Sequence, residues 1–170
     1  TEDYNVGDEY LFRLHLAPKL LGSNVDSLLM SGNRSKGFRL DEASFLLAET
    51  GFATRLDYST FRDTLIRGEV KYFNVLGDLH LRERFLGKHT LAVSYSLDFG
   101  EDLDNDRELL LGADNGLRGY RARTFTGDKR MLLNVEERAH LFDDVFRLFS
   151  VGTVVFLDAG GTGSDTLSKV

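Results

Sequence analysis

The sequence predicts an all-β protein, an antiparallel transmembrane β-barrel of which about seven strands are present, and three observations support this prediction. Several stretches alternate apolar and polar side chains with a period of two, which is typical of strands with one apolar face. No stretch shows a convincing helical periodicity. The chain has 17 glycines and one proline. Glycine marks turns and strand ends, and because proline is nearly absent, almost every backbone N–H group can donate a hydrogen bond within a continuous β-sheet.

Composition narrows the class of protein. The 170 residues suffice for one domain, residues 1–170, and a hydrophobic content of 42% is that of an ordinary globular protein. No run approaches the roughly 18 to 20 apolar residues of a membrane-spanning helix, which excludes a helical membrane protein but not a barrel, whose strands are only half apolar. The absence of cysteine removes thiol chemistry, and a net charge of −6 without a basic stripe argues against a nucleic-acid partner.

Seven strands are expected in chain order. Glu9–Ala17 alternates well, 26–40 is diluted by polar residues, and 43–57 is either one bent strand or a hairpin that turns at Glu49-Thr50-Gly51. The other strands are 61–74, 89–100, 128–141 and 145–159. Between the strands we expect loops at 18–25 and 100–127, a connection at 77–88, turns at 41–43 and 142–144, and an irregular tail from Gly160.

Two of these strands carry the strongest patterns. In 89–100 one face is wholly apolar and ends in Phe99 while the other is small and hydroxylated, as in a lipid-facing strand, although a β-sandwich strand gives the same alternation. In 61–74, Arg67, Glu69 and Lys71 share a face, which therefore needs a wet or ion-paired interior. If the loop 100–127 lies on the extracellular side of the membrane, the turns at 41–43 and 142–144 lie on the opposite rim, as in bacterial outer-membrane barrels. The connection 77–88 is long for such a turn.

Patterns for catalysis or metal binding are weak. Asp102, Asp104, Asp106 and Glu108 have calcium-loop spacing, but the required Gly and the final acid are missing, so a solvated acidic loop is favoured. The four histidines lack zinc-site spacing, and Asp98-Phe99-Gly100 stands without the other kinase motifs. We therefore expect no enzymatic activity, no metal site and no cofactor.

The segment 109–160 joins a cation in a glycine-rich loop to two strands that offer acids on a common face. Its simplest interpretation is a surface loop with a structural ion pair, because buried pairs alone do not mark function. Four short sequence patterns in a fixed order favour a functional role for this segment. They are Leu110-Leu111-Gly112-Ala113-Asp114-Asn115, Gly116-Leu117-Arg118-Gly119-Tyr120, Asn134-x-Glu136-x-Arg138 and Gly152-x-x-x-Phe156-x-Asp158-x-Gly160.

In order and spacing, these patterns resemble the signatures of the BamA/TamA superfamily of outer-membrane barrels, the surface-antigen type, which includes the two-partner-secretion transporters and the patatin-linked barrels. The resemblance covers residues 110–160, and the preceding strands agree with it in character only. It implies a bacterial outer-membrane location and a function in outer-membrane protein assembly and insertion, or in polypeptide translocation. The implied partners are outer-membrane lipid and client polypeptides.

The resemblance also implies that the loop 100–127 folds into the barrel lumen, where Arg118 meets Asp158 with Glu136 nearby and Phe156 packs on the arginine stem. An arginine fork on carboxylates makes charge-assisted bonds that lysine cannot replace. The loop side of this lock comprises Gly116, Arg118, Gly119 and Tyr120. The strands 128–141 and 145–159 supply Asn134, Glu136, Arg138, Gly152, Phe156 and Asp158.

The chain departs from the superfamily in strand number. Members have sixteen strands and end in a strand with a terminal aromatic, whereas this chain shows roughly the seventh to thirteenth strands and ends in Lys169-Val170. Open sheet edges are not viable in lipid, so the remaining strands should come from the rest of its own chain or from a second copy. Two alternatives stay open: a barrel anchor for an unseen N-terminal domain such as a patatin-like lipase, and a soluble β-sandwich binding module.

Overall fold

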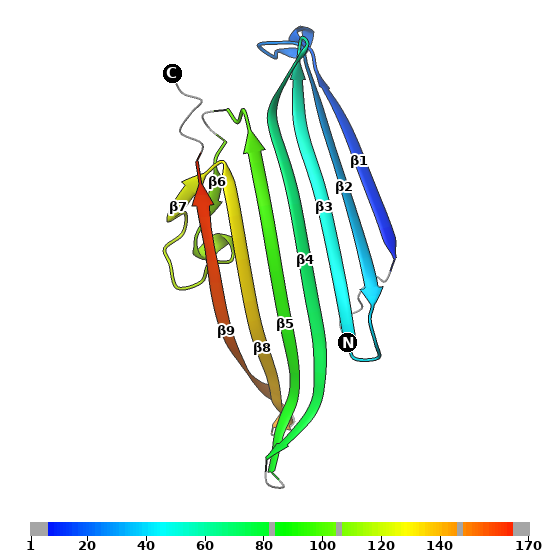
Figure 1. Cartoon of the computed structure of the whole chain (residues 1–170), viewed down its shortest axis with the longest axis vertical. Helices are drawn as coiled ribbons and strands as arrows, with labels where there is room; N and C mark the ends of the chain where they lie inside the picture. The colour runs from blue at the N-terminus through cyan, green and yellow to red at the C-terminus, as the bar shows by residue number, and fades with distance from the viewer. Residues whose placement is uncertain (1–6, 82–83, 105–106, 146–147, 165–170) are drawn as a thin grey trace.

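One antiparallel sheet of seven strands dominates the computed structural model, which describes residues 7–81, 84–104, 107–145 and 148–164. Its strands are β1 (Asp8–Ala17), β2 (Ser27–Arg39), β3 (Ser44–Asp57), β4 (Thr60–Leu81), β5 (Arg84–Glu101), β8 (Lys129–Val145) and β9 (Phe149–Gly163). They succeed one another across the sheet in chain order, and within the described residues β1 and β9 are its two open edges (Figure 1).

A second, two-stranded sheet is formed by the long loop between β5 and β8. It pairs β6 (Leu109–Leu111) with β7 (Phe125–Gly127), and the 3-10 turn η2 (Ala113–Asn115) lies between them. This small sheet lies against β8 and β9, at the left of Figure 1. A second 3-10 turn, η1 (Lys19–Leu21), follows β1. In the part of the chain that the structure describes, no helix is long and apolar enough to cross a membrane.

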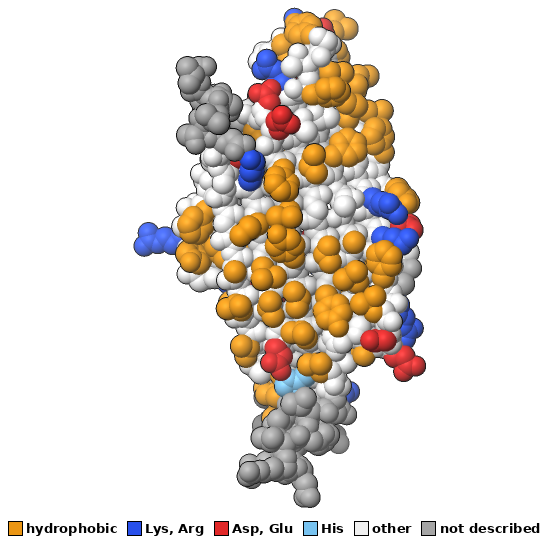
Figure 2. All heavy atoms as spheres, in the orientation of Figure 1, with side chains coloured by type: hydrophobic (Ala, Val, Ile, Leu, Met, Phe, Trp, Pro, Cys, Tyr) orange, Lys and Arg blue, Asp and Glu red, His pale blue; other side chains and the backbone are white. Residues whose placement is uncertain are grey.

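The two faces of the main sheet differ in character. We call the face that carries the long loop the inner face and the opposite one the outer face. Hydrophobic side chains cover the middle of the outer face, with charges mostly towards its ends and one edge (Figure 2). The buried hydrophobic cluster, Leu111, Leu117 and Leu132 with Phe125 packed on it, lies between the loop and the inner face. The chain thus buries its apolar core under one loop and leaves an apolar surface exposed.

Several predictions of the fold are confirmed. The chain is all-β and antiparallel, all seven expected strands are present, and 43–57 is a single strand rather than a hairpin. That strand is irregular where its pairing with β4 shifts between Ala53 and Arg55. The expected ion pairing on the inner face of β4 is also present, with Arg67 Nε 2.9 Å from an Asp98 oxygen and Lys71 Nζ 3.1 Å from a Glu69 oxygen.

Three boundaries were predicted wrongly. The connection expected at 77–88 is a continuation of β4 and β5, whose register shifts at Gly77, a residue with φ +75°. The turn expected at 142–144 lies inside β8, where Phe142 still pairs with Val151. The tail expected to be irregular from Gly160 remains in β9 as far as Gly163. In each case the prediction was wrong because glycines or acids that usually mark turns lie within long, paired β-strands.

Candidate functional site on the inner face

The loop reaches the inner face because β6 and β7 clamp its two limbs together. Leu109 pairs with Gly127 and Leu111 with Phe125. Beyond the clamp, the N–H groups of Asn115 and Leu117 both donate to the Gly112 carbonyl, at 3.1 and 3.0 Å. This tight turn directs Leu117 into the buried cluster, where it is 2% exposed. The next residue, Arg118, is thereby presented to β8 and β9.

Two glycines on this path are constrained by packing, and at Gly112 a Cβ would lie 2.5 Å from backbone atoms of Arg121 and Arg123. Gly116 has φ +101°, a left-handed conformation that other residues rarely adopt, and a Cβ there would lie 2.8 Å from Leu132 Cδ2. Gly119 also has a positive φ of +91°, but the space around it is open. Gly116 is therefore constrained by both conformation and packing, whereas Gly119 is constrained by conformation alone.

The Arg118 guanidinium binds two carboxylates. Its Nε and Nη2 donate to the two oxygens of Asp158 at 2.8 and 2.7 Å, and Nη1 donates to Glu136 Oε1 at 2.6 Å. The backbone N–H of Arg118 adds a bond to Asp158 at 3.0 Å. Chiefly because of Asp158, the pKa of Arg118 lies above its ordinary value, so the group stays charged. The expected contacts of Arg118 with Asp158 and Glu136 are thus present as a two-pronged fork.

The strands complete the surroundings of Asp158. Its side chain is 2% exposed, and Asn134, directly opposite on β8, donates from Nδ2 to Asp158 Oδ1 at 2.7 Å and to the Gly116 carbonyl at 2.6 Å. Asn134 therefore joins loop, β8 and β9 through one amide. Asp158 accepts bonds from a guanidinium, a backbone N–H and an amide, which compensates its burial.

Of the remaining predicted residues, Arg138 and Phe156 contact the lock, whereas Tyr120 does not. Arg138 donates to Glu136 Oε2 at 2.9 Å, so both oxygens of Glu136 are engaged. The Phe156 ring lies under the Arg118 guanidinium itself, 3.9 Å from Cζ, rather than along the arginine stem as expected. Tyr120 is half exposed and makes an edge contact with Phe125, 5.4 Å between ring centroids, away from the carboxylates.

Gly152 also lies away from the lock. It pairs with His140, and a Cβ there would come within 3.0 Å of the Ala139 carbonyl oxygen. Its place in the sequence pattern is explained by close packing of β9 on β8 rather than by contact with the loop.

A second ion-paired cluster, not identified from the sequence, holds the base of the loop. Asp98 on β5 is 1% exposed. Arg130 of β8 donates to Asp98 Oδ2 from Nε and Nη2, at 2.8 and 2.6 Å, and from Nη1 to the Leu110 carbonyl at 3.0 Å. Arg67 of β4 approaches the other oxygen of Asp98 at 2.9 Å. The sequence indicated that the face of β4 with Arg67 needs ion pairs or water, but it did not identify Asp98 and Arg130 as the partners.

A third cluster fixes the entrance to the loop. Arg55 Nη1 lies 2.7 Å from Asp63 and 2.7 Å from Asp104, and the Asp104 N–H donates to Asp63 at 2.7 Å. The bond from Arg55 lowers the pKa of Asp104. Asp104, predicted to be a solvated acid, is therefore part of a structural ion pair, whereas Asp102 and Glu108 are exposed as predicted and Asp106 lies outside the described residues. Among the described residues, no group of three or more acidic or histidine side chains is arranged to hold a metal.

These three clusters can hold a loop in one position and release it when the ion pairs are broken. A hollow of about 350 Å³ lies beside the lock, between Lys71 on β4 and Arg118 in the loop.

No family model matches the chain, and no curated protein or solved structure matches it either.

Proposed function

We propose that the chain is the membrane-embedded part of a BamA/TamA-type outer-membrane barrel that assembles outer-membrane proteins or translocates polypeptides. The observation that carries this proposal is the fork of Arg118 on Asp158 and Glu136, formed within the four ordered signatures. The fork pins a long loop onto the inner face of a sheet whose outer face is apolar. In a barrel, the inner face would be the lumen and the loop would lie within it.

The shape of the apolar surface independently supports strands inclined to a membrane. On β1 the outward apolar run is Tyr10–Leu16, and the pairing register carries Phe12 across five strands to Gly163 of β9. The outward run on β9, however, is Val151–Ala159, centred on Val155. Measured from Phe12, one residue before the middle of the β1 run, the apolar surface therefore drifts by about eight residues, ~26 Å, over six strand spacings, ~29 Å. This slope of roughly 40° is the tilt that transmembrane barrel strands adopt.

Charges mark the limits of this surface on β8. Met131, Leu133 and Val135 face outward between Lys129 and Glu137 on the same face, a separation of about eight residues or ~26 Å along the strand. Corrected for the same tilt, this run spans ~20 Å across the surface, close to the apolar band of roughly 25 Å on outer-membrane barrels.

The mechanism requires no covalent chemistry. Among the described residues β1 and β9 are the outer strands of the sheet, and further strands of the same chain or a second copy would cover their edges. A client strand would add to a weak seam of the completed barrel by β-augmentation, and the loop would limit access through the lumen. The Arg118 lock would set how readily that loop moves.

Detergent dependence tests the membrane assignment. The purified protein should be monodisperse in detergent micelles and should aggregate when detergent is removed, because the apolar face then meets water. A chain that stays monodisperse without detergent would overturn the proposal and favour the soluble binding module.

Loss of client assembly separates the transport function from a mere anchor. In cells, Arg118→Ala should reduce the amount of folded outer-membrane proteins, while Arg123→Ala should not. Unchanged client levels in both variants, with lipase activity in a preceding domain, would support the anchor instead.

A further inference from the structure

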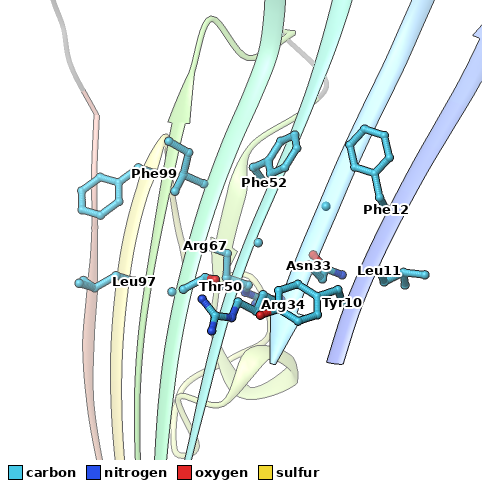
Figure 3. A pocket seen from close by; sticks show the side chains of 14 residues that line it. Tyr10, Leu11, Phe12, Asn33, Arg34, Thr50, Phe52, Arg67, Leu97 and Phe99 are labelled. Atoms are coloured by element: carbon cyan, nitrogen blue, oxygen red, sulfur yellow. The ribbon is translucent and has the colours of Figure 1, made fainter. Parts of the chain in front are cut away.

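The outer face contains a hollow of about 570 Å³ that opens among aromatic and aliphatic side chains. Phe99, Phe52 and Phe12 follow one another across its upper part, with Leu97, Thr50, Tyr10 and Arg34 below them (Figure 3). The lining is mostly apolar, and its polar residues are Asn33, Arg34, Thr50 and Arg67. The apolar side chains that line it on this face are Tyr10, Phe12, Phe52, Ile66, Leu97 and Phe99.

The hollow exists because one strand position lacks a side chain. Gly68 of β4 lies between Thr50 and Leu97 in the pairing register, and a Cβ added to Gly68 would meet nothing within 4 Å. By contrast, Phe52 covers Gly32, since a Cβ at Gly32 would lie 2.5 Å from the Phe52 ring. The open floor of the hollow is therefore at Gly68.

Arg34 lines the hollow, and a second cation, Lys36, lies two positions farther along the same strand. Arg34 and Lys36 follow each other on the outward side of β2, and both contact Asp8 of β1, at 3.3 and 3.0 Å. One carboxylate faces two cations, which leaves a surplus positive charge at a site where the side chains are a third to a half exposed. The Arg34 guanidinium also lies 5.2 Å from the centre of the Tyr10 ring.

The position of these cations matches a boundary of the apolar surface. Outward residues of β2 before Arg34 are Leu28, Met30 and Gly32, whereas Arg34 and Lys36 begin the charged part. On β8 the apolar run ends in the same direction at Glu137, and the two boundaries are displaced by the tilt derived above. A membrane lipid placed against this face would therefore bring its chains to the hollow and its head group to Arg34 and Lys36.

We propose that this hollow is a binding site for an anionic glycerophospholipid, with one acyl chain over Gly68 and the head-group phosphate at Arg34 and Lys36. The proposal rests on the proposed function, because it requires the outer face to meet lipid. It goes further by assigning one place on that face and one class of head group. Tyr10 adds an aromatic ring with a hydroxyl at the same level, as is common at membrane interfaces.

Native mass spectrometry of the full chain in detergent, titrated with phosphatidylglycerol or phosphatidylcholine of identical chains, tests this assignment. One surplus cation, worth roughly 1 kcal/mol, should give about a fivefold preference for phosphatidylglycerol. Arg34→Gln with Lys36→Gln should abolish the preference but keep binding of both lipids. Gly68→Leu should fill the hollow and lower retention of both lipids severalfold.

Two matched controls accompany these variants. Gly161→Leu introduces the same side chain in the same register row on β9, where a Cβ also meets nothing within 4 Å, and should bind lipid as the unchanged protein does. Lys129→Gln removes a cation at the opposite boundary and should keep the preference.

Equal binding of the two lipids by the unchanged protein, or unchanged lipid retention in a folded Gly68→Leu variant, would overturn the lipid site while leaving the barrel proposal intact. Solubility without detergent would instead overturn the barrel proposal itself. Competition by glycerophosphoglycerol, the head group without chains, would show that the cations bind a free phosphate ester and would also overturn the assignment.

Discussion

Replacing Arg118 by alanine should destabilise the docked loop more than replacing either of the nearby arginines, Arg121 and Arg123, by alanine. The change removes two bonds to Asp158 and one to Glu136, all between 2.6 and 2.8 Å. Asp158 is only 2% exposed and would keep its charge with Asn134 as its main remaining partner. Breaking a buried pair in this way costs about 3 to 5 kcal/mol, and the lower end applies because the Arg118 side chain is 33% exposed.

Thermal unfolding of the full-length protein in detergent measures this cost. A loss of about 3 kcal/mol should lower the midpoint by roughly 6 to 12 °C for a chain of this size. Arg118→Lys should fall between alanine and arginine, since lysine restores a charge but not the fork. Asp158→Asn should be milder than Arg118→Ala, because it removes the buried charge itself.

Arg123 provides the control for this experiment. Its side chain is 71% exposed and lies 3.9 Å from Asp114, so Arg123→Ala should change the midpoint little. Equal shifts for Arg118→Ala and Arg123→Ala would refute the reasoning. Additive effects of Arg118→Ala and Asp158→Ala in a double-mutant cycle would do the same, because residues in contact should couple.

Three further predictions concern the rest of the loop. Gly116→Ala should cost more than Gly119→Ala, about 1 to 3 kcal/mol for the strained conformation plus a clash that only Gly116 makes, and thermal unfolding of the two variants compares them. Asp98→Ala should expose the base of the loop to trypsin, because it leaves two arginines without their shared carboxylate, and equal cleavage of the variant and the unchanged protein would contradict this. Because the bond from Arg55 lowers the pKa of Asp104, the stability from this pair is present above the ordinary aspartate range and is lost as pH falls below it. The protection of the residue 104 amide, measured as its exchange rate relative to the intrinsic rate at the same pH, should fall there, and an Asp104→Asn variant should show no such fall.

The sequence was sufficient to predict the strands and the contacts of Arg118, for different physical reasons. Alternation of side chains with a period of two depends only on local geometry, so 89–100 and 61–74 could be assigned without knowing their neighbours. The pairing of Arg118 with Asp158 came from a resemblance rather than from physical spacing, since 40 residues separate the two in the chain.

The clusters at Asp98 and Asp63 could not be predicted because they depend on register and bulges. Asp98 meets Arg130 directly across β5 and β8, an alignment that no local pattern specifies. Asp63 has φ +51° at the irregularity in the pairing of β3 with β4, which turns its carboxylate towards Arg55. The glycines at the end of β9 were wrongly predicted to begin an irregular tail, for a similar reason. A Cβ at Gly160 would occupy space taken by Met131 and Leu111, so this glycine serves packing within the sheet and does not mark a turn.

The order of the lock's parts along the chain has a consequence for its formation. The arginine of the loop precedes β8 and β9, but the carboxylate that receives its fork lies in β9, the last strand of the sheet. The base of the loop can be held earlier, since Asp98 and Arg130 need only β5 and β8. Closure of the loop therefore requires β9, and a docked Arg118 reports that β9 has already joined the sheet.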